Sequence, residues 1–402
     1  MIKTVLSNKK KILILGVIFL LAVSILFSAV SVRANEAVHM LETYFTAEEL
    51  KEDYFHPEVL AQLPVAELDH YRHHFSEGLG EFVEVEELEG DYYNVVFENG
   101  FIEMEFMVDH MGRVSGLFFL SVVDFDIGLE ELEEKFSELP GDISLLVTKN
   151  GEELMALNPE EELAVASAFK IAVLKGLHSE IDAGNMSWED TVTLEKRHKT
   201  LPTGQLQNWP DGSPLTLHTL ASLMISVSDN TATDVLMDHI GREKIEEYFE
   251  GPKPVLTTRE FFVLKNPENE DLREEYLAAE EEEKYEIIER TADRSLPRQS
   301  LFARGEVIAP EVEWFTSVSA LEDLMAEVKD IDLMGINPGM GRRDFWDNVA
   351  YKGGSEPGVL NYTYWLELED DSYFLSATWN NDALLDHNEF SRLFLQLLHV
   401  LD

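Results

Sequence analysis

Apolar and polar residues along the chain repeat with two periods, which predict both helices and strands. From Phe45 to Gly78 the apolar spacing is helical, with breaks near Pro57 and Pro64. Apolar residues then alternate with polar ones on both sides of an Asn99-Gly100 turn, and residues 114–120 predict a third strand. Helices followed by antiparallel strands predict a small α+β domain over residues 37–122.

A second set of elements follows a short acidic helix, which we expect to join two domains within residues 123–141. Two apolar stretches flank the Asn150-Gly151 turn and predict a hairpin over residues 143–157. Further helices are predicted over residues 169–181, 216–227, 231–239, 317–328 and 386–401, and strands over 349–352, 359–369 and 373–379. Residues 264–290 are acidic and helical, and we expect an exposed insertion there. The chain is therefore predicted to be a multi-domain α+β protein, with an antiparallel sheet flanked by helices in residues 142–402.

The first 34 residues predict a targeting segment. Lysines at positions 3 and 9–11 precede an uncharged stretch, Ile12–Val32, and Ala34 would suit a signal peptidase. The same stretch is long enough to remain as an uncleaved membrane anchor. Both alternatives leave the rest of the chain outside the cytoplasm, either secreted or anchored to the outer face of the cytoplasmic membrane.

The net charge and the lack of cysteine exclude several classes of binding partner and of chemistry. With 78 Asp and Glu against 31 Lys and Arg, the net charge is −47, which repels nucleic acid and anionic lipid. We therefore expect no nucleic-acid partner, and we hypothesise surroundings rich in salt, where self-repulsion is screened. The absence of cysteine excludes disulfides, thiolate metal sites and cysteine nucleophiles.

Three histidines, His70, His73 and His74, share one face of a predicted helix. No acidic or histidine cluster elsewhere in the sequence is linked to these histidines by a metal-binding pattern. A solvated helix face is therefore a simpler interpretation than a metal site. We expect no metal, no cofactor and a monomeric protein.

A Ser-x-x-Lys pattern stands at the start of a predicted helix, at Ser167 and Lys170. One helical turn places the two side chains on one face, with about 5–6 Å between their Cβ atoms. A lysine there can accept the serine proton if burial and a second cation lower its pKa. Alone the pattern has little weight, because Ser7 and Lys10 repeat it inside the targeting segment.

Two more motifs follow in order along the chain. Ser228-Asp229-Asn230 lies between two predicted helices, and Lys352-Gly353-Gly354 lies on a predicted strand. The three motifs in this order are the combination that class A β-lactamases and penicillin-binding proteins use. Residues 143–401 therefore resemble a serine hydrolase domain of the class A β-lactamase type.

This resemblance implies catalytic roles for four side chains. Ser167 would attack an acyl carbon, and Lys170 would be the base for that step. Ser228 would relay the proton to the leaving group. Lys352 would supply positive potential for Ser228 and for a substrate carboxylate.

The resemblance also implies a set of substrate-binding groups. Asn230 would bond to the substrate and to Lys170, and Gly353, Gly354 and Ser355 would border the substrate. The backbone N–H groups of Ser167 and Ser355 would form an oxyanion hole.

Two departures from the family pattern affect the expected chemistry. Class A enzymes carry a Glu-x-x-Leu-Asn loop that positions the deacylating water, and no such sequence follows Ser228. Glu260 is a conceivable substitute, although an ordinary ion-paired residue is the simpler interpretation. Gly353 replaces the usual hydroxyl residue. Acylation is thus expected to be intact, while fast hydrolysis of a β-lactam acyl-enzyme is in doubt.

Several functions stay open from these motifs. The first is a hydrolase acting on β-lactams, esters or related small acyl compounds, and the second is a DD-peptidase of the penicillin-binding kind. The third is a ligand-binding or sensor protein that is acylated but turns over slowly. Helices followed by antiparallel strands in the first domain predict a cone-shaped fold like that of steroid isomerases. The two domains together resemble the β-lactamase-like esterases of clavulanic acid gene clusters. Aromatic residues such as Trp314 and Tyr362 could line a cleft, but core positions are commoner for them.

Overall fold

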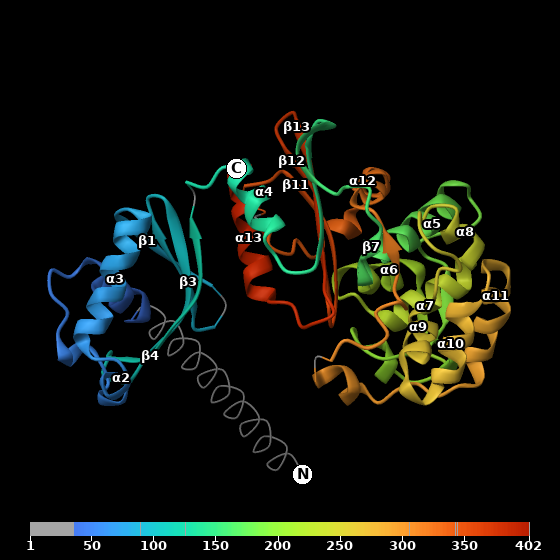
Figure 1. The fold of residues 1–402 in the computed structure, drawn as a ribbon, viewed down its shortest axis with the longest axis horizontal. Helices are drawn as coiled ribbons and strands as arrows, with labels where there is room; N and C mark the ends of the chain where they lie inside the picture. The colour runs from blue at the N-terminus through green and yellow to red at the C-terminus, as the bar shows by residue number, and fades with distance from the viewer. Residues whose placement is uncertain are drawn as a thin grey trace, which may run out of the picture. The chain divides into compact units, whose positions relative to one another are not determined.

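The computed structural model describes residues 36–401, except for residues 89, 125, 305, 342 and 344. These residues divide into two compact units, with the boundary between Ile127 and Gly128 (Figure 1). The predicted targeting segment lies outside the described residues, so export stays a prediction. Among the helices that are described, none combines the length and the apolar character needed to cross a bilayer.

The first unit contains a four-stranded antiparallel sheet in which every strand pairs with its neighbour in sequence. Residues 36–46 are helical. The elements that follow are η1 (Glu52–Tyr54), α2 (Pro57–Gln62), α3 (Val65–Leu79), β1 (Phe82–Glu87), β2 (Tyr92–Phe97), β3 (Gly100–Val108) and β4 (Val114–Asp124).

Side-chain alternation explains the central strands of this sheet. Every second residue of β2 and β3 is buried, and these apolar residues form one core with Leu68 and Leu79 of α3. The Asn99-Gly100 hairpin is present, with Phe97 opposite Gly100. The prediction of three strands was incomplete, because β1 is a fourth. This strand is acidic and buries no residue fully. Its sequence therefore shows no regular alternation of apolar and polar residues from which a strand could be predicted.

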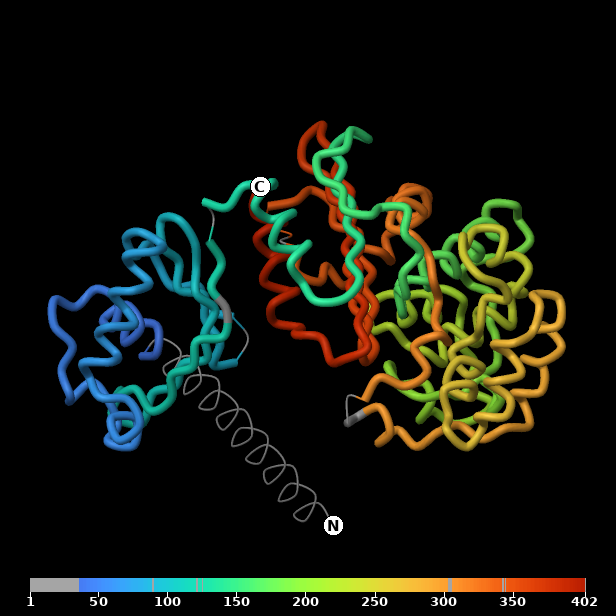
Figure 2. Tube along the Cα trace, viewed as in Figure 1, coloured from blue at the N-terminus to red at the C-terminus, as the bar shows by residue number. Residues whose placement is uncertain are grey.

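The second unit is built on a five-stranded antiparallel sheet in the order β11-β12-β13-β5-β6. The predicted hairpin forms β5 and β6, and the three late strands were predicted as well. Figure 2 shows the early hairpin beside the last strands of the chain, where β13 pairs with β5. The strands are β5 (Asp142–Lys149), β6 (Glu152–Leu157), β11 (Asn348–Glu356), β12 (Val359–Leu368) and β13 (Asp371–Asn380).

Helices cover both faces of this sheet (Figure 1). On one face, Tyr362 and Tyr364 of β12 pack on Phe394 of α13 (His387–Val400), beside α4 (Leu129–Ser137). On the other face, Phe374 joins the core of α12 (Val318–Ala326) and the helical part of the unit. Lys352 and Gly354 of β11 share the face of Ala350, which belongs to that second core.

The helical part holds the remaining elements of the unit, with β7 paired to β10 and β8 paired to β9. They are β7 (Leu163–Ala164), η2 (Ala166–Phe169), α5 (Lys170–Asp182), β8 (Thr191–Thr193), η3 (Lys196–His198), η4 (Leu206–Asn208), β9 (Pro214–Thr216), α6 (Leu217–Ser226), α7 (Asn230–Ile240), α8 (Arg242–Glu246), α9 (Thr258–Lys265), η5 (Pro267–Asn269), α10 (Glu270–Ala278), α11 (Glu281–Glu289), η6 (Arg290–Asp293), η7 (Gln299–Arg304), β10 (Phe315–Thr316) and η8 (Asp332–Gly335).

The acidic stretch over residues 264–290 is helical as predicted, but it is not simply an exposed insertion. Leu272 and Tyr276 of α10 and Ile287 and Ile288 of α11 are buried in the main core of the unit. The acidic residues occupy the outward faces of both helices and outnumber the apolar stripe. The acidic composition therefore did not reveal that each helix packs one apolar face against the core.

Candidate active site

Ser167 lies in the short η2 turn immediately before α5, and Lys170 is the first residue of that helix. Ser167 is partly exposed, whereas Lys170 is fully buried. The residue before the serine, Ala166, has a φ of 44°, a left-handed conformation that is uncommon for a residue with a side chain. The nucleophile candidate is thus held on a tight turn above a buried lysine.

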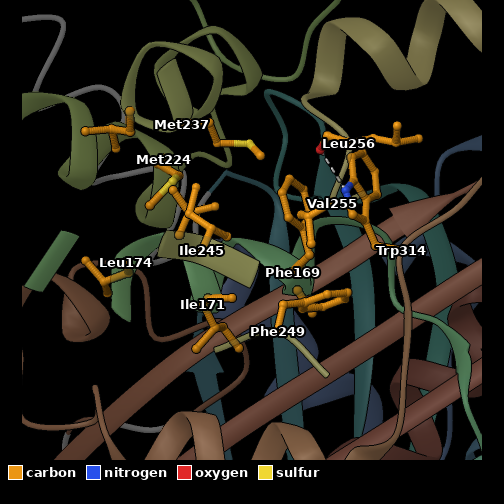
Figure 3. Packing of buried hydrophobic residues seen from close by; sticks show 14 of the residues in the cluster. Phe169, Ile171, Leu174, Met224, Met237, Ile245, Phe249, Val255, Leu256 and Trp314 are labelled. Atoms are coloured by element: carbon orange, nitrogen blue, oxygen red, sulfur yellow. Dashed lines mark hydrogen bonds between the residues drawn. The ribbon is translucent and has the colours of Figure 1, made fainter. Parts of the chain in front are cut away.

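Aromatic stacking fixes the turn from behind. The Phe169 ring stacks on Trp314 with centroids 4.1 Å apart, and Trp314 stacks on Phe261 of α9 at 4.4 Å. The Trp314 indole N–H donates to the carbonyl oxygen of Leu256 at 2.9 Å (Figure 3). Segments from three distant parts of the chain therefore hold the position of Ser167.

The Lys170 amine has three polar partners. Its Nζ lies 2.6 Å from Asn230 Oδ1, 2.7 Å from the Ser228 carbonyl oxygen and 3.0 Å from Ser228 Oγ. Burial lowers the pKa of Lys170 well below its ordinary value, and the positive charge of Lys352 lowers it further. A neutral amine keeps two N–H donors and gains a lone pair that can accept a hydroxyl proton.

Ser228 connects the two lysines. Lys352 Nζ lies 3.2 Å from Ser228 Oγ, the hydroxyl that Lys170 also contacts. Ser228 itself has a φ of 55°, a second left-handed residue in this site. Thr203 donates its hydroxyl to the Ser228 carbonyl oxygen at 2.7 Å and braces this strained residue.

Asp229 anchors the loop around the second motif. One oxygen of its buried carboxylate caps α7 by accepting the Ala232 N–H, and the other accepts the N–H groups of Gln205 and Leu206. A Cβ at Gly204 would lie 2.2 Å from Asp229 Cγ, so the loop can approach this closely only with glycine there.

Strand β11 approaches the nucleophile through a glycine. A Cβ at Gly354 would lie 2.8 Å from the backbone nitrogen of Ser167 and 2.0 Å from the Val165 oxygen. Burial lowers the pKa of Lys352, two residues earlier on the same face, to about 7. The motif thus combines a close backbone approach with a cation that titrates near neutrality.

Gly353 occupies the position where the family has a hydroxyl residue. A Cβ there would lie 2.4 Å from the hydroxyl oxygen of Tyr351. The phenol therefore stands in the place of the missing side chain, and burial raises its pKa, which keeps it a hydrogen-bond donor. No sequence motif marks Tyr351, so its place at the site was not predicted.

One cavity of about 330 Å³ unites these groups. Seven of the eight residues singled out from the sequence line it, and Lys170 lies buried behind them: Ser167, Ser228, Asn230, Lys352, Gly353, Gly354 and Ser355. The opposite wall comes from α9, through Thr258, Phe261 and Phe262, and Tyr351, Tyr362 and Glu356 also line the cavity. Nothing in the sequence of α9 indicated this wall.

Glu260 does not line this cavity. One of its oxygens accepts the Thr257 N–H in a capping box at the start of α9, and the other binds Arg242 at 2.6 Å. The carboxylate is therefore engaged in structure, as the simpler interpretation of this residue held.

Metal-binding groups do not gather in the part of the chain that the structure describes. No three side chains of the histidine, aspartate or glutamate type are placed to share an ion there. His70, His73 and His74 are exposed along α3.

Comparison with known proteins finds relatives of the second unit. Residues 129–283 match the model of the β-lactamase enzyme family. Over 98 residues the chain is 26% identical to β-lactamase VEB-1 of Pseudomonas aeruginosa, a match that covers 24% of this chain and 33% of that protein. The match thus spans about a third of the curated relative.

Two solved structures are also similar. A β-lactamase from Sphaerobacter thermophilus is 18% identical with a TM-score of 0.45, covering 69% of this chain and 96% of that one. The protein PBP-A is 16% identical with a TM-score of 0.45, covering 67% and 94%. Both TM-scores are low, so the similarity rests on the sequence matches. Over residues 129–283 the second unit is similar in sequence to the β-lactamase enzyme family.

Proposed function

We propose that the second unit is an acyl-transferring serine hydrolase with Ser167 as its nucleophile. The observation that carries this proposal is the convergence of Ser167, Ser228 and Lys352 on one cavity, with Lys170 buried behind the first two. The substrate class is small β-lactams, esters or related amides, which present an acyl carbon to the serine.

Acylation would begin with proton transfer from Ser167 Oγ to the neutral Lys170 amine. Oγ then forms a bond to the acyl carbon, and the carbonyl oxygen becomes negative. The backbone N–H groups of Ser167 and Ser355 would bind that oxygen, since β11 lies against the nucleophile turn at Gly354.

The leaving group needs a proton when its bond to the acyl carbon breaks. Ser228 Oγ contacts both amines, so it can pass a proton from Lys170 to the leaving nitrogen or oxygen. After this step the acyl group is an ester of Ser167, and the lysines have returned to their starting charge.

Charge favours an anionic substrate in this cavity. Lys352 supplies a cation and Tyr351 a hydroxyl donor at the strand edge, inside a protein whose net charge is −47. We infer that the two groups bind a substrate carboxylate, the role for which the family uses its hydroxyl residue.

Covalent labelling tests the nucleophile directly. A fluorescent penicillin and a fluorophosphonate should label the wild-type protein and leave Ser167→Ala unlabelled. Hydrolysis of a reactive ester by that variant should fall by roughly 10⁴-fold, because acyl transfer then has no nucleophile. Ser137→Ala, an exposed serine on α4, is the matched control and should be labelled normally.

Equal labelling of the wild-type protein and Ser167→Ala would contradict the proposal. Release of D-alanine from a muropeptide by the wild-type protein would favour the DD-peptidase over the β-lactam or ester hydrolase.

We also propose that the protein works outside the cytoplasm. The support is the basic and then apolar order of the first 34 residues. Fractionation of cells that express the full chain should recover it from the medium or the membrane, and recovery from the cytosol would contradict export.

A further inference from the structure

A carboxyl group shares the strand face that carries the active-site lysine. Side chains of a β-strand alternate between faces, so Lys352, Gly354 and Glu356 of β11 point to the same side. Gly354 lies against the Ser167 turn, and Glu356 lines the same cavity as Ser167. Glu356 therefore lines the cavity two residues beyond the glycine that contacts the nucleophile turn.

The wall near this carboxyl is largely apolar. Phe261 and Phe262 of α9 line the cavity, with Trp314 stacked on Phe261. Such a wall limits the number of waters that reach the acyl carbon. A carboxylate in these surroundings is desolvated and therefore more basic than in water.

A buried ion pair stands behind this wall. Lys265 of α9 binds Glu313, both side chains are almost fully buried, and the ammonium lies 4.6 Å from the Phe261 ring centroid. The second oxygen of Glu313 has no hydrogen-bond partner within the described residues. It is an acceptor available to a water or to a protonated neighbour.

The charges around Glu356 set its proton affinity. Burial raises the pKa of Glu356 to about 7, and the negative charge of Glu313 adds to this rise. The positive charge of Lys265 acts in the opposite direction, as does that of Lys170 whenever its amine is protonated. A general base works best with a pKa close to the working pH.

We propose that Glu356 is the general base that activates the water for deacylation of Ser167. This inference rests on the proposed function and deepens it. The chain lacks the Glu-x-x-Leu-Asn loop and uses Glu260 as a helix cap, so another carboxylate must hold the water if turnover is fast. Among the described residues, Glu356 is the carboxylate that lines the cavity, and the charges of Glu313 and Lys265 act on it.

The step balances with no further reactant. Glu356 takes a proton from the water while the water oxygen bonds to the acyl carbon of the Ser167 ester. The tetrahedral intermediate then expels Ser167 Oγ, which receives that proton through Glu356. The acyl product leaves as a free acid, and both side chains return to their initial state.

Intact-mass spectrometry of the full chain can separate the two half-reactions. Benzylpenicillin and p-nitrophenyl acetate are the probes, and the rates of adduct formation and decay are followed for the wild-type protein and Glu356→Gln. Adduct formation should be unchanged in the variant, while decay should slow by roughly 100-fold or more. Glu153→Gln, an exposed carboxyl on β6, is the control and should decay like the wild-type protein.

The pH profile gives a second readout. A carboxylate base is active above its pKa, so wild-type decay should rise with pH through about 7 and then level off. Glu356→Gln should lose this rise. A merely structural role of Glu356 would slow decay without removing that dependence.

The outcomes distinguish this inference from the proposed function. An adduct that decays equally in the wild-type protein and Glu356→Gln overturns the role of Glu356 and leaves the nucleophile assignment intact. So does a wild-type adduct that never decays, or a variant that loses adduct formation as well. A wild-type protein that forms no adduct and hydrolyses neither probe overturns both.

Discussion

At the scale of single residues, burial rather than residue type determines the chemistry of the site. Lys170 and Lys352 would be permanent cations in water, yet desolvation lowers the pKa of both. The two lysines have different roles because Lys170 is buried against Ser228 and Asn230, whereas Lys352 lines the cavity. Asp234 shows the same effect on an acid, since burial raises its pKa to about 7 although Thr258 and Arg259 donate hydrogen bonds to it.

The pKa of Lys352 predicts how substrate choice depends on pH. The ammonium is charged below about pH 7 and neutral above it. We expect kcat/KM for an anionic substrate to fall above pH 7 relative to a neutral ester with the same acyl group, by up to about tenfold per pH unit. Lys352→Arg keeps its charge to high pH, so its preference for the anion should persist at pH 9. A wild-type preference that is flat from pH 6 to pH 9 would contradict this role.

At the scale of elements, the loop before α7 depends on one close approach. Gly204 has a φ of 96° and lies against Asp229, whose carboxylate caps α7 and accepts two further N–H groups of the loop. The same loop supplies Thr203, which braces Ser228. The loop and helix α7 therefore together set the position of the Ser228-Asp229-Asn230 motif.

Two glycine variants separate close contact from backbone strain. Gly212 also has a positive φ, of 86°, but nothing lies within 4 Å of a Cβ built there. Gly212→Ala should lower the free energy of unfolding by about 1–2 kcal/mol through strain alone. Gly204→Ala adds a clash with Asp229, so we expect a loss at least about 2 kcal/mol larger, together with slower labelling of Ser167. Denaturant unfolding measures both, and equal losses would show that the contact is unimportant.

At the scale of the whole molecule, the net charge of −47 opposes the compact state. Many carboxylates form ion pairs, such as Glu275 with Arg290 and Asp271 with Arg294. The cations are too few to pair all of them. The excess acidic residues repel one another across the surface, and the active-site lysines form a local positive region inside this field.

Added salt should therefore stabilise the protein. The Debye length shortens from about 10 Å at 0.1 M to about 3 Å at 1 M, which screens repulsion between surface carboxylates. We expect the Tm of the second unit to rise between 0.1 and 2 M KCl, by about 2–4 °C for each kcal/mol gained. Calorimetry in a KCl series tests this, and a Tm that stays constant or falls would contradict the adaptation to salt.

The sequence by itself determined much of this protein, because several decisive features are local. The Asn-Gly turns marked both hairpins, and apolar periods located most helices and the late strands. The three motifs and their order pointed to one kind of serine chemistry, because each motif is a short run of residues that can be recognised in the sequence alone. Their departures from the family pattern were readable too.

Only the tertiary structure decided what depends on contacts between distant segments. It brought Ser167, Ser228 and Lys352 to one cavity, placed the Tyr351 phenol where Gly353 has no side chain, and put Glu356 in the wall of that cavity. It also buried one face of the acidic helices and paired β1, whose sequence shows no alternation. Burial and partner charges set the chemistry of the site, and both depend on packing between distant segments, such as those of Ser228 and Lys352, which lie 124 positions apart.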